Sequence, residues 1–279
     1  MVAIVQPVEA AAIQQMTLKP MSPWSIEQSE DTCRLVRTFG TAEDPYLLRI
    51  RADAPGYQFD ITLAGSQVSA FQNARERSIS YGSGAALPFA PMIRGTFKTY
   101  GAVIVFSNEM AEKRRAFDDE TEQPYPNMPL EAGIDRINLT ASNKNLVLET
   151  GSIAPAMEAM RKCMDGVVQG WGLDPAVQAT LSRRVRPLNR DAVYALVAAD
   201  DPPPAVRALG GVARVHMRVM VDATGNPVDC KTWPTDQVPD LKVGACEIML
   251  KNARYAPALD ANGVAVPSYF ATSVVYRVF

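Results

Sequence analysis

Short runs in which apolar and polar residues alternate constrain this chain most, because a two-residue period fits a half-buried β-strand. The run YQFDITLAG, residues 57–65, places aromatic and aliphatic side chains on one face and polar ones on the other. The run VARVHMRVMV, residues 212–221, does the same, with Arg214, His216 and Arg218 on its polar face. With 21 prolines and 17 glycines to make turns, this pattern predicts antiparallel sheets and places His216 near the surface.

The period changes to a helical one in two places. Between residues 153 and 171, apolar residues recur at helical spacing, and several of them are methionines. Such a methionine stripe is more typical of a core face than of a ligand groove. Gly151-Ser152 is a candidate N-cap and Gly172 a candidate stop, while Asp174-Pro175 predicts a second, short helix. A helix over residues 240–253, capped by Asp240, completes an α+β pattern.

The order of these elements predicts two domains. We expect a flexible lead over residues 1–21 and a β-rich N-terminal domain with C-terminal helices over residues 22–190. A linker over residues 191–211 contains three consecutive prolines, which extend the backbone. The C-terminal domain, residues 212–279, reads as strand, strand, helix, strand, which predicts a three-stranded antiparallel sheet with one helix. The acidic, proline-rich segment 117–129 is expected to be a loop or lid.

The charge balance and hydropathy exclude several classes of protein. The formal net charge is −2, from 28 basic and 30 acidic residues, whereas a nucleic-acid-binding protein usually has a basic surplus. No stretch approaches the ~20 apolar residues that span a bilayer. The first residues, MVAIVQPVEAAAIQQ, are too weakly apolar for a signal peptide. If the protein is exported, we expect its signal to have been removed.

The four cysteines, Cys33, Cys163, Cys230 and Cys246, are far apart. None forms a C-x-x-C pair, and His216 is the one histidine, so the pattern argues against a zinc site. An even count at wide spacing favours two disulfides and an oxidising compartment. Four buried free thiols in a cytosolic protein are the alternative.

Candidate catalytic residues are few. Asp222 lies in a DATG run similar to the D-T-G of aspartic proteases, but these enzymes need two such carboxylates and no second copy occurs. A hairpin turn explains this run better. No G-x-S-x-G elbow accompanies His216, and no phosphate-binding glycine loop is present. The sequence therefore predicts no enzyme site, no metal site and no cofactor.

Residues 210–279 resemble the C-terminal domain of TonB-family proteins. The resemblance rests on a D-x-x-G-x-x-V hairpin motif beginning at Asp222, and on a later aromatic-x-P-A motif, Tyr255 to Ala258, followed by Gly263 and Val266. Because one subgroup of this family has a cysteine after the hairpin and another on the helix, the resemblance implies a Cys230–Cys246 disulfide of roughly 3 kcal/mol. The remaining two cysteines, Cys33 and Cys163, would then join the N-terminal sheet to its helix.

The resemblance also implies a function, namely the binding of a peptide or protein by β-strand addition at the edge of the C-terminal sheet. The residues predicted at this edge are Ser273, Val274, Val275, Tyr276, Arg277, Val278 and Phe279. The expected partner is a protein or peptide of the bacterial envelope, such as an outer-membrane receptor, and the expected location is the periplasm. TonB itself has a membrane anchor and a long proline-rich stretch, neither of which this chain shows, so we do not expect it to transmit force. The alternatives are a hydrolase with an inter-domain site that uses Asp222 or His216, and a structural envelope protein that dimerises through the same edge.

Overall fold

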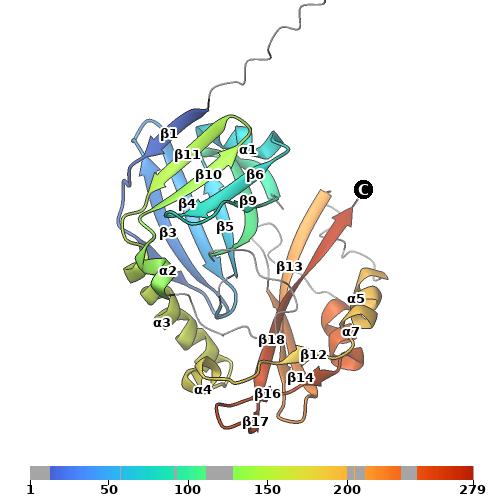
Figure 1. Cartoon of the computed structure of the whole chain (residues 1–279). Coiled ribbons are helices and arrows are strands. Elements are labelled where there is room, and N and C mark those ends of the chain that lie inside the picture. The colour runs from blue at the N-terminus through green and yellow to red at the C-terminus, as the bar shows by residue number, and fades with distance from the viewer. Residues whose placement is uncertain are drawn as a thin grey trace, which may run out of the picture.

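The computed structural model describes residues 13–56, 58–90, 93–110, 128–199, 204, 211–233 and 244–278. Two units make up the molecule, a β-sandwich and a smaller sheet with helices beside it (Figure 1). The sandwich unit comprises the elements from β1 to α3, and the C-terminal unit comprises those from α4 to β18. The fold is therefore of the predicted α+β class, with largely antiparallel sheets and separate helices.

Two sheets face each other in the sandwich unit. The six-stranded sheet has the order β2 (Ser25–Gln28), β3 (Cys33–Gly40), β4 (Pro45–Ala52), β5 (Gln58–Ala64), β9 (Gly101–Glu109) and β8 (Ile93–Phe97). The five-stranded sheet has the order β1 (Gln14–Leu18), β11 (Lys144–Glu149), β10 (Arg136–Ala141), β6 (Arg77–Tyr81) and β7 (Leu87–Pro88). All neighbouring strands are antiparallel except β1, which runs parallel to β11.

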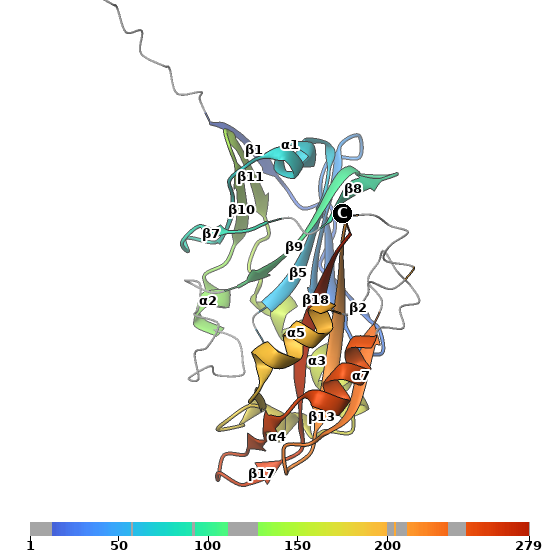
Figure 2. The ribbon, with the colours of Figure 1, turned by 90° about the vertical axis from the view of Figure 1, so that its right-hand side faces the viewer.

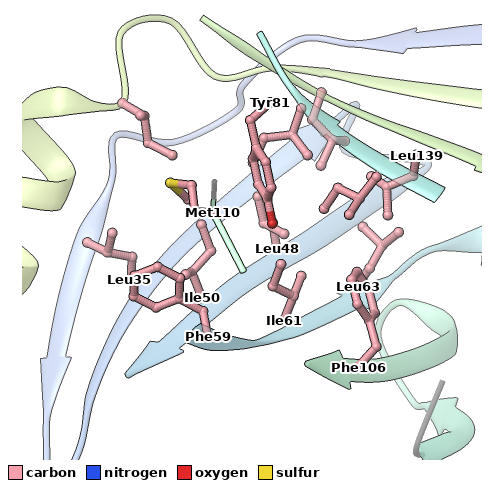
Figure 3. Packing of buried hydrophobic residues seen from close by; sticks show 14 of the residues in the cluster. Leu35, Leu48, Ile50, Phe59, Ile61, Leu63, Tyr81, Phe106, Met110 and Leu139 are labelled. Atoms are coloured by element: carbon pink, nitrogen blue, oxygen red, sulfur yellow. The ribbon is translucent and has the colours of Figure 1, made fainter. Parts of the chain in front are cut away.

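The main hydrophobic core lies between these two sheets (Figure 3). Phe59, Ile61 and Leu63 of β5 point into it, as the alternation in the sequence predicts. The same alternation turns Asp60 and Thr62 to the outer face of the sheet, yet both side chains are buried. Something must therefore cover this polar outer face, and the C-terminal unit does so at Asp60.

Helix α3 (Ala154–Gly170) packs its predicted methionine stripe against the sandwich. The helix stops before Gly172, whose φ of 80° lies in the left-handed region that glycine adopts without strain. The expected cap at Gly151-Ser152 is wrong, because the N-cap residue is Ile153 and no side chain caps the helix. Two short helices complete this unit, α1 (Ser69–Asn73) after the 3-10 turn Ser66–Val68, and α2 (Met128–Ala132).

The C-terminal unit has a three-stranded antiparallel sheet in the order β14 (Pro227–Trp233), β13 (Gly211–Val221) and β18 (Ser268–Val278). Helices α5 (Arg190–Ala199) and α7 (Gly244–Asn252) cover one face and enclose a second hydrophobic core with Val215, Met217 and Val219 of β13. Figure 2 shows these helices in front of the sheet, with the sandwich behind it. The remaining short elements are α4 (Pro175–Ala179), β12 (Arg186–Pro187), β15 (Tyr255–Ala256), β16 (Ala258–Leu259) and β17 (Ala265–Val266).

Three expectations about the course of the chain need correction or fall outside the described residues. Residues 14–18 of the expected flexible lead form β1, because they pair with β11. Residues 191–199 of the expected linker belong to α5, because Val193 and Val197 pack into the second core. Leu181 and Val185, expected in the N-terminal domain, belong to the same core. Residues 117–127, most of the expected lid, and Asp240, the expected helix cap, lie outside the described residues.

Candidate functional site

The predicted binding strand, β18, is the outer strand of its sheet. It pairs with β13 along its whole length, from Gly211 opposite Val278 to Val221 opposite Ser268. In the part of the chain that the structure describes, no strand pairs with its other side. An outer strand of this kind presents a row of backbone N–H and C=O groups to an incoming strand.

The side chains of the predicted edge residues do not share one environment. Ser273 and Val275 lie opposite His216 and Arg214, on the face turned toward the sandwich, and Val275 is 39% exposed. Val274 packs against the second core, and Tyr276 is part of it, with 5% of its surface exposed. The expectation that the Tyr276 side chain contacts a partner is therefore wrong, because it points beneath the helices.

The remaining predicted edge residues are described less fully. The backbones of Arg277 and Val278 belong to β18, and Phe279 lies outside the described residues. At the other end of the strand, the Ser268 hydroxyl donates to Gln178 over 2.6 Å, and the Tyr269 ring contacts Trp171 with centroids 5.0 Å apart. The part of the edge that a partner could reach therefore begins at about Ala271.

Opposite charges meet where the two units contact each other. Four acidic residues of the sandwich unit face four basic residues of the C-terminal sheet, and we call these eight residues the charged seam. The acidic ones are Glu30, Asp31, Asp53 and Asp60, and the basic ones are Arg214, His216, Arg218 and Lys231. The basic residues alternate along β13 and β14, so one face of this sheet supplies all of them.

His216 lies at the centre of the charged seam, between two carboxylates. Its Nδ1 atom is 3.2 Å from an oxygen of Asp53, and its Nε2 atom is 2.8 Å from an oxygen of Asp60. An ionised carboxylate only accepts hydrogen bonds, so both ring nitrogens must donate, which requires the doubly protonated ring. The residue is 7% exposed. Our expectation that it lies near the surface is wrong, because the sandwich covers the polar face of β13.

Each of these two carboxylates has further donors. Asp53 accepts hydrogen bonds from Arg51 over 2.7 Å and from the Trp233 indole over 3.0 Å. Asp60 accepts from Arg214 over 3.1 Å and from the Ser107 hydroxyl. Burial alone would raise the pKa of Asp60, but the hydrogen bond and charge of His216, with Arg214 and Ser107, lower it to about 2. Asp60 is therefore a carboxylate at neutral pH.

A second cluster of the charged seam centres on Asp31. This residue is 5% exposed and binds Arg218 over 2.8 Å, Lys231 over 2.7 Å and the Trp171 indole over 3.2 Å. Arg218 also lies over the Trp171 ring, 4.4 Å from its centroid. Partial burial alone would lower the pKa of Lys231, but its hydrogen bonds to Asp31 and Glu30 raise it. Arg218 and Lys231 are directly opposite each other on adjacent strands, so without Asp31 they would repel.

The trio of Asp53, Asp60 and His216 has the residue types of a metal site, and its potential ligand atoms lie within 4.8 Å of one another. Its geometry argues against that role. The two ring nitrogens of His216 point to different carboxylates, so one ion cannot replace both contacts. Each carboxylate also accepts from arginine, whose charge repels a cation. The trio is better explained as an ion-pair cluster between the units.

The residues of the alternative hydrolase are not assembled. Asp222 caps its own turn, where one carboxylate oxygen accepts from the backbone N–H groups of Thr224 and Asn226, each over 2.9 Å. The hydrogen bond from the Thr224 side chain, followed by that from the Asn226 backbone, lowers the pKa of Asp222. Ser107 donates to Asp60 and is also bonded to Arg214. It therefore does not form the serine–histidine contact that nucleophilic catalysis requires.

Both predicted disulfides are present. Cys33 is bonded to Cys163 and Cys230 to Cys246, which uses all four cysteines of the chain. The first joins β3 to α3, and the second joins β14 to α7. Two such bonds are typical of proteins in oxidising compartments. No helix among the described residues has the length and hydropathy needed to cross a bilayer.

The four acids of the charged seam were not singled out in the sequence. A charged residue within a strong strand pattern, Asp60, was the one weak indication of a polar contact. Arg214, His216 and Arg218 were correctly placed on one face of their strand. Nothing in the sequence indicates what covers that face. Comparison of the chain with protein-family models, with curated proteins and with solved structures gives no match.

Proposed function

We propose that this protein is a non-enzymatic binding module of the bacterial cell envelope, and that it binds a peptide or protein strand along β18. The observation that carries the proposal is the position of this strand in its sheet. Helices α5 and α7 cover one face of the sheet, and the sandwich contacts the other face through the charged seam. The edges are then the main part of the sheet left for a partner.

The two edges are not equivalent. Strand β14 is tied to α7 by the Cys230–Cys246 disulfide and to the sandwich by Lys231. Strand β18 is longer, at 11 residues against 7, and both strands carry an exposed valine, Val275 on β18 and Val228 on β14. Backbone hydrogen bonds along such a strand supply affinity, and the side chains beside it select the partner. These differences favour β18 as the binding edge.

A relationship to the TonB-family C-terminal domain remains part of this proposal. The order β13, β14, α7, β18 supports it, since it is the order of that domain. The contact between the two quoted motifs also supports it. Gly225 of the hairpin has a φ of 88°, and a Cβ atom there would lie 2.2 Å from the Tyr255 carbonyl oxygen. This close approach gives a physical reason for the two motifs to occur together. A periplasmic location, proposed on the same resemblance, agrees with the disulfides.

Two adjacent proline substitutions, Val274→Pro and Val275→Pro, test the proposal. Consecutive residues of a strand direct their N–H groups to opposite sides, so one substitution removes a hydrogen bond to β13 and the other blocks only the outer edge. The melting temperature identifies the variant that has lost a hydrogen bond to β13, because only that substitution should lower the melting temperature strongly. A displayed peptide library selected against the full chain would then supply the ligand.

We expect the edge-blocking variant to lose binding of the selected peptides while keeping its stability. Bound peptide should also slow the exchange of outward-directed amides between Ala271 and Val278. Equal binding by the wild type and the edge-blocking variant would overturn the proposal. Size measurements on the same samples address the alternative, since an edge-mediated homodimer would dissociate in this variant without any peptide.

A further inference from the structure

The two units have separate hydrophobic cores, and no residue belongs to both. The charged seam connects them through six salt bridges. Interfaces between domains that are this polar resemble transient protein–protein contacts, for which relative motion is the default expectation. The seam is therefore suited to opening without loss of either fold.

The charges of the seam are segregated between the units, although Arg51 of the sandwich unit also binds Asp53. Every acidic member belongs to the sandwich unit and every basic member to the C-terminal sheet. Closing the seam relieves the repulsion among the basic groups, as Asp31 does for Arg218 and Lys231. Loss of the His216 charge would leave Asp53 and Asp60 with one positive partner each, Arg51 and Arg214, which weakens a largely buried contact.

Histidine is the residue type that ordinarily changes charge near neutral pH, and His216 is the one histidine of the seam. The charged groups that face it or share its partners are Asp53, Asp60, Arg51, Arg214 and Arg218. None of these residue types ordinarily changes charge between pH 6 and 9, and the low pKa of Asp60 keeps it ionised. Loss of one proton from His216 would remove a hydrogen bond and direct a ring lone pair at a carboxylate oxygen.

We infer that the charged seam is a pH-dependent latch, closed when His216 is doubly protonated and opened when it loses a proton. The two units then separate while each keeps its own core and its own disulfide. Opening uncovers the basic face of β13 and β14 and the acidic outer face of the sandwich. This inference does not rest on the proposed strand binding at β18.

Tryptophan fluorescence and small-angle scattering of the full chain between pH 6 and 9 test the latch. Trp171 and Trp233 both contact the seam, so replacing the third tryptophan by Trp24→Phe leaves two reporters of it. We expect the emission to shift to longer wavelength and the radius of gyration to increase as pH rises, with unchanged far-ultraviolet circular dichroism. All four cysteines are paired, so thiolate exchange should not complicate the alkaline samples.

A His216→Gln variant should have the open emission and radius at both pH values. The control Asp135→Asn removes a carboxylate of the sandwich unit whose salt bridge with Arg136 is exposed. Its emission and radius of gyration should change with pH as those of the wild type do. An unchanged radius and emission in the wild type from pH 6 to 9 would overturn the latch. The same holds if His216→Gln keeps the compact radius. If that variant does not fold, the wild-type titration alone decides.

Discussion

Replacement of Asp31 by asparagine should destabilise the protein far more than the same chemical change at its neighbour, Glu30. Both carboxylates bind Lys231, over 2.7 Å from Asp31 and 2.6 Å from Glu30. They differ in burial, because the Asp31 side chain is 7% exposed and that of Glu30 is 84% exposed. The two substitutions therefore compare a buried carboxylate, which also binds Arg218 and Trp171, with an exposed one on the same lysine.

The magnitude follows from the groups left behind. Asp31→Asn leaves the Arg218 guanidinium, 7% exposed, without a counter-charge, and turns the amide NH₂ group, itself a donor, toward Lys231. Removing one partner of a buried ion pair typically costs about 3–5 kcal/mol. Arg218 and Lys231, opposite each other in the sheet, then repel without a shared counter-ion. The amide oxygen can still accept from Trp171, so we expect about 3 kcal/mol, near the lower end of that range. Glu30→Gln removes an exposed pair and should cost about 0–1 kcal/mol.

Urea denaturation of both variants at neutral pH, followed by tryptophan fluorescence, measures these differences in the free energy of unfolding. The slope of the transition should be checked in each variant, because a changed slope would indicate that the two units no longer unfold together. Equal costs for Asp31→Asn and Glu30→Gln would refute the reasoning. In that case the seam would be solvated in solution, and the burial that underlies both the cost and the latch would be absent.

Three further predictions concern pH, the disulfides and the turns. The pKa of Asp60 is about 2 instead of its ordinary 3.8, so its ionised form contributes roughly 2 kcal/mol above about pH 4, lost as pH falls toward 2. In urea denaturation over this pH range, the free energy of unfolding of Asp60→Asn should fall less with decreasing pH than that of the wild type. Replacing both Cys230 and Cys246 by alanine should lower the free energy of unfolding by roughly 3 kcal/mol, for a bond that spans 16 positions, and an unchanged value would contradict this. Gly225→Ala should cost clearly more than Gly263→Ala in thermal unfolding, although both glycines have positive φ. Only the first would place its Cβ atom 2.2 Å from a backbone oxygen, and the second meets nothing within 4 Å.

The sequence predicted elements well where a local pattern decides the structure. The alternation in residues 57–65 placed Phe59, Ile61 and Leu63 in the core, and the methionine stripe identified α3. Asp174 caps the short helix α4, as its position before a proline predicts. In each case the physical cause, a periodic apolar face or a capping side chain, lies within a few residues. The disulfide pairing came from a resemblance to a family, because spacing alone could not select it.

Elements without a local pattern were missed. Strand β1 has five residues, three of them exposed, and it is ordered by pairing with β11, about 130 positions later. The expected linker contains α5, which buries Val193 and Val197 in the second core and packs Tyr194 partly against it. A weak apolar period of this kind cannot be distinguished from a solvated segment until the surface that covers it is known. Tyr276 was assigned to the wrong surface because strand alternation gives two faces without saying which one helices cover.

The charged seam shows why the composition of a whole chain says little about its faces. The net charge of −2 argued against a nucleic-acid partner, yet four basic residues lie on one face of a single small sheet. They are balanced within the molecule by Glu30, Asp31, Asp53 and Asp60, which come from strands and loops more than 150 positions earlier. The argument from net charge against nucleic-acid binding therefore applies to the closed molecule. In an open one, the basic face would carry a strong local field, and the acids of the sandwich would compete with any acidic partner for it.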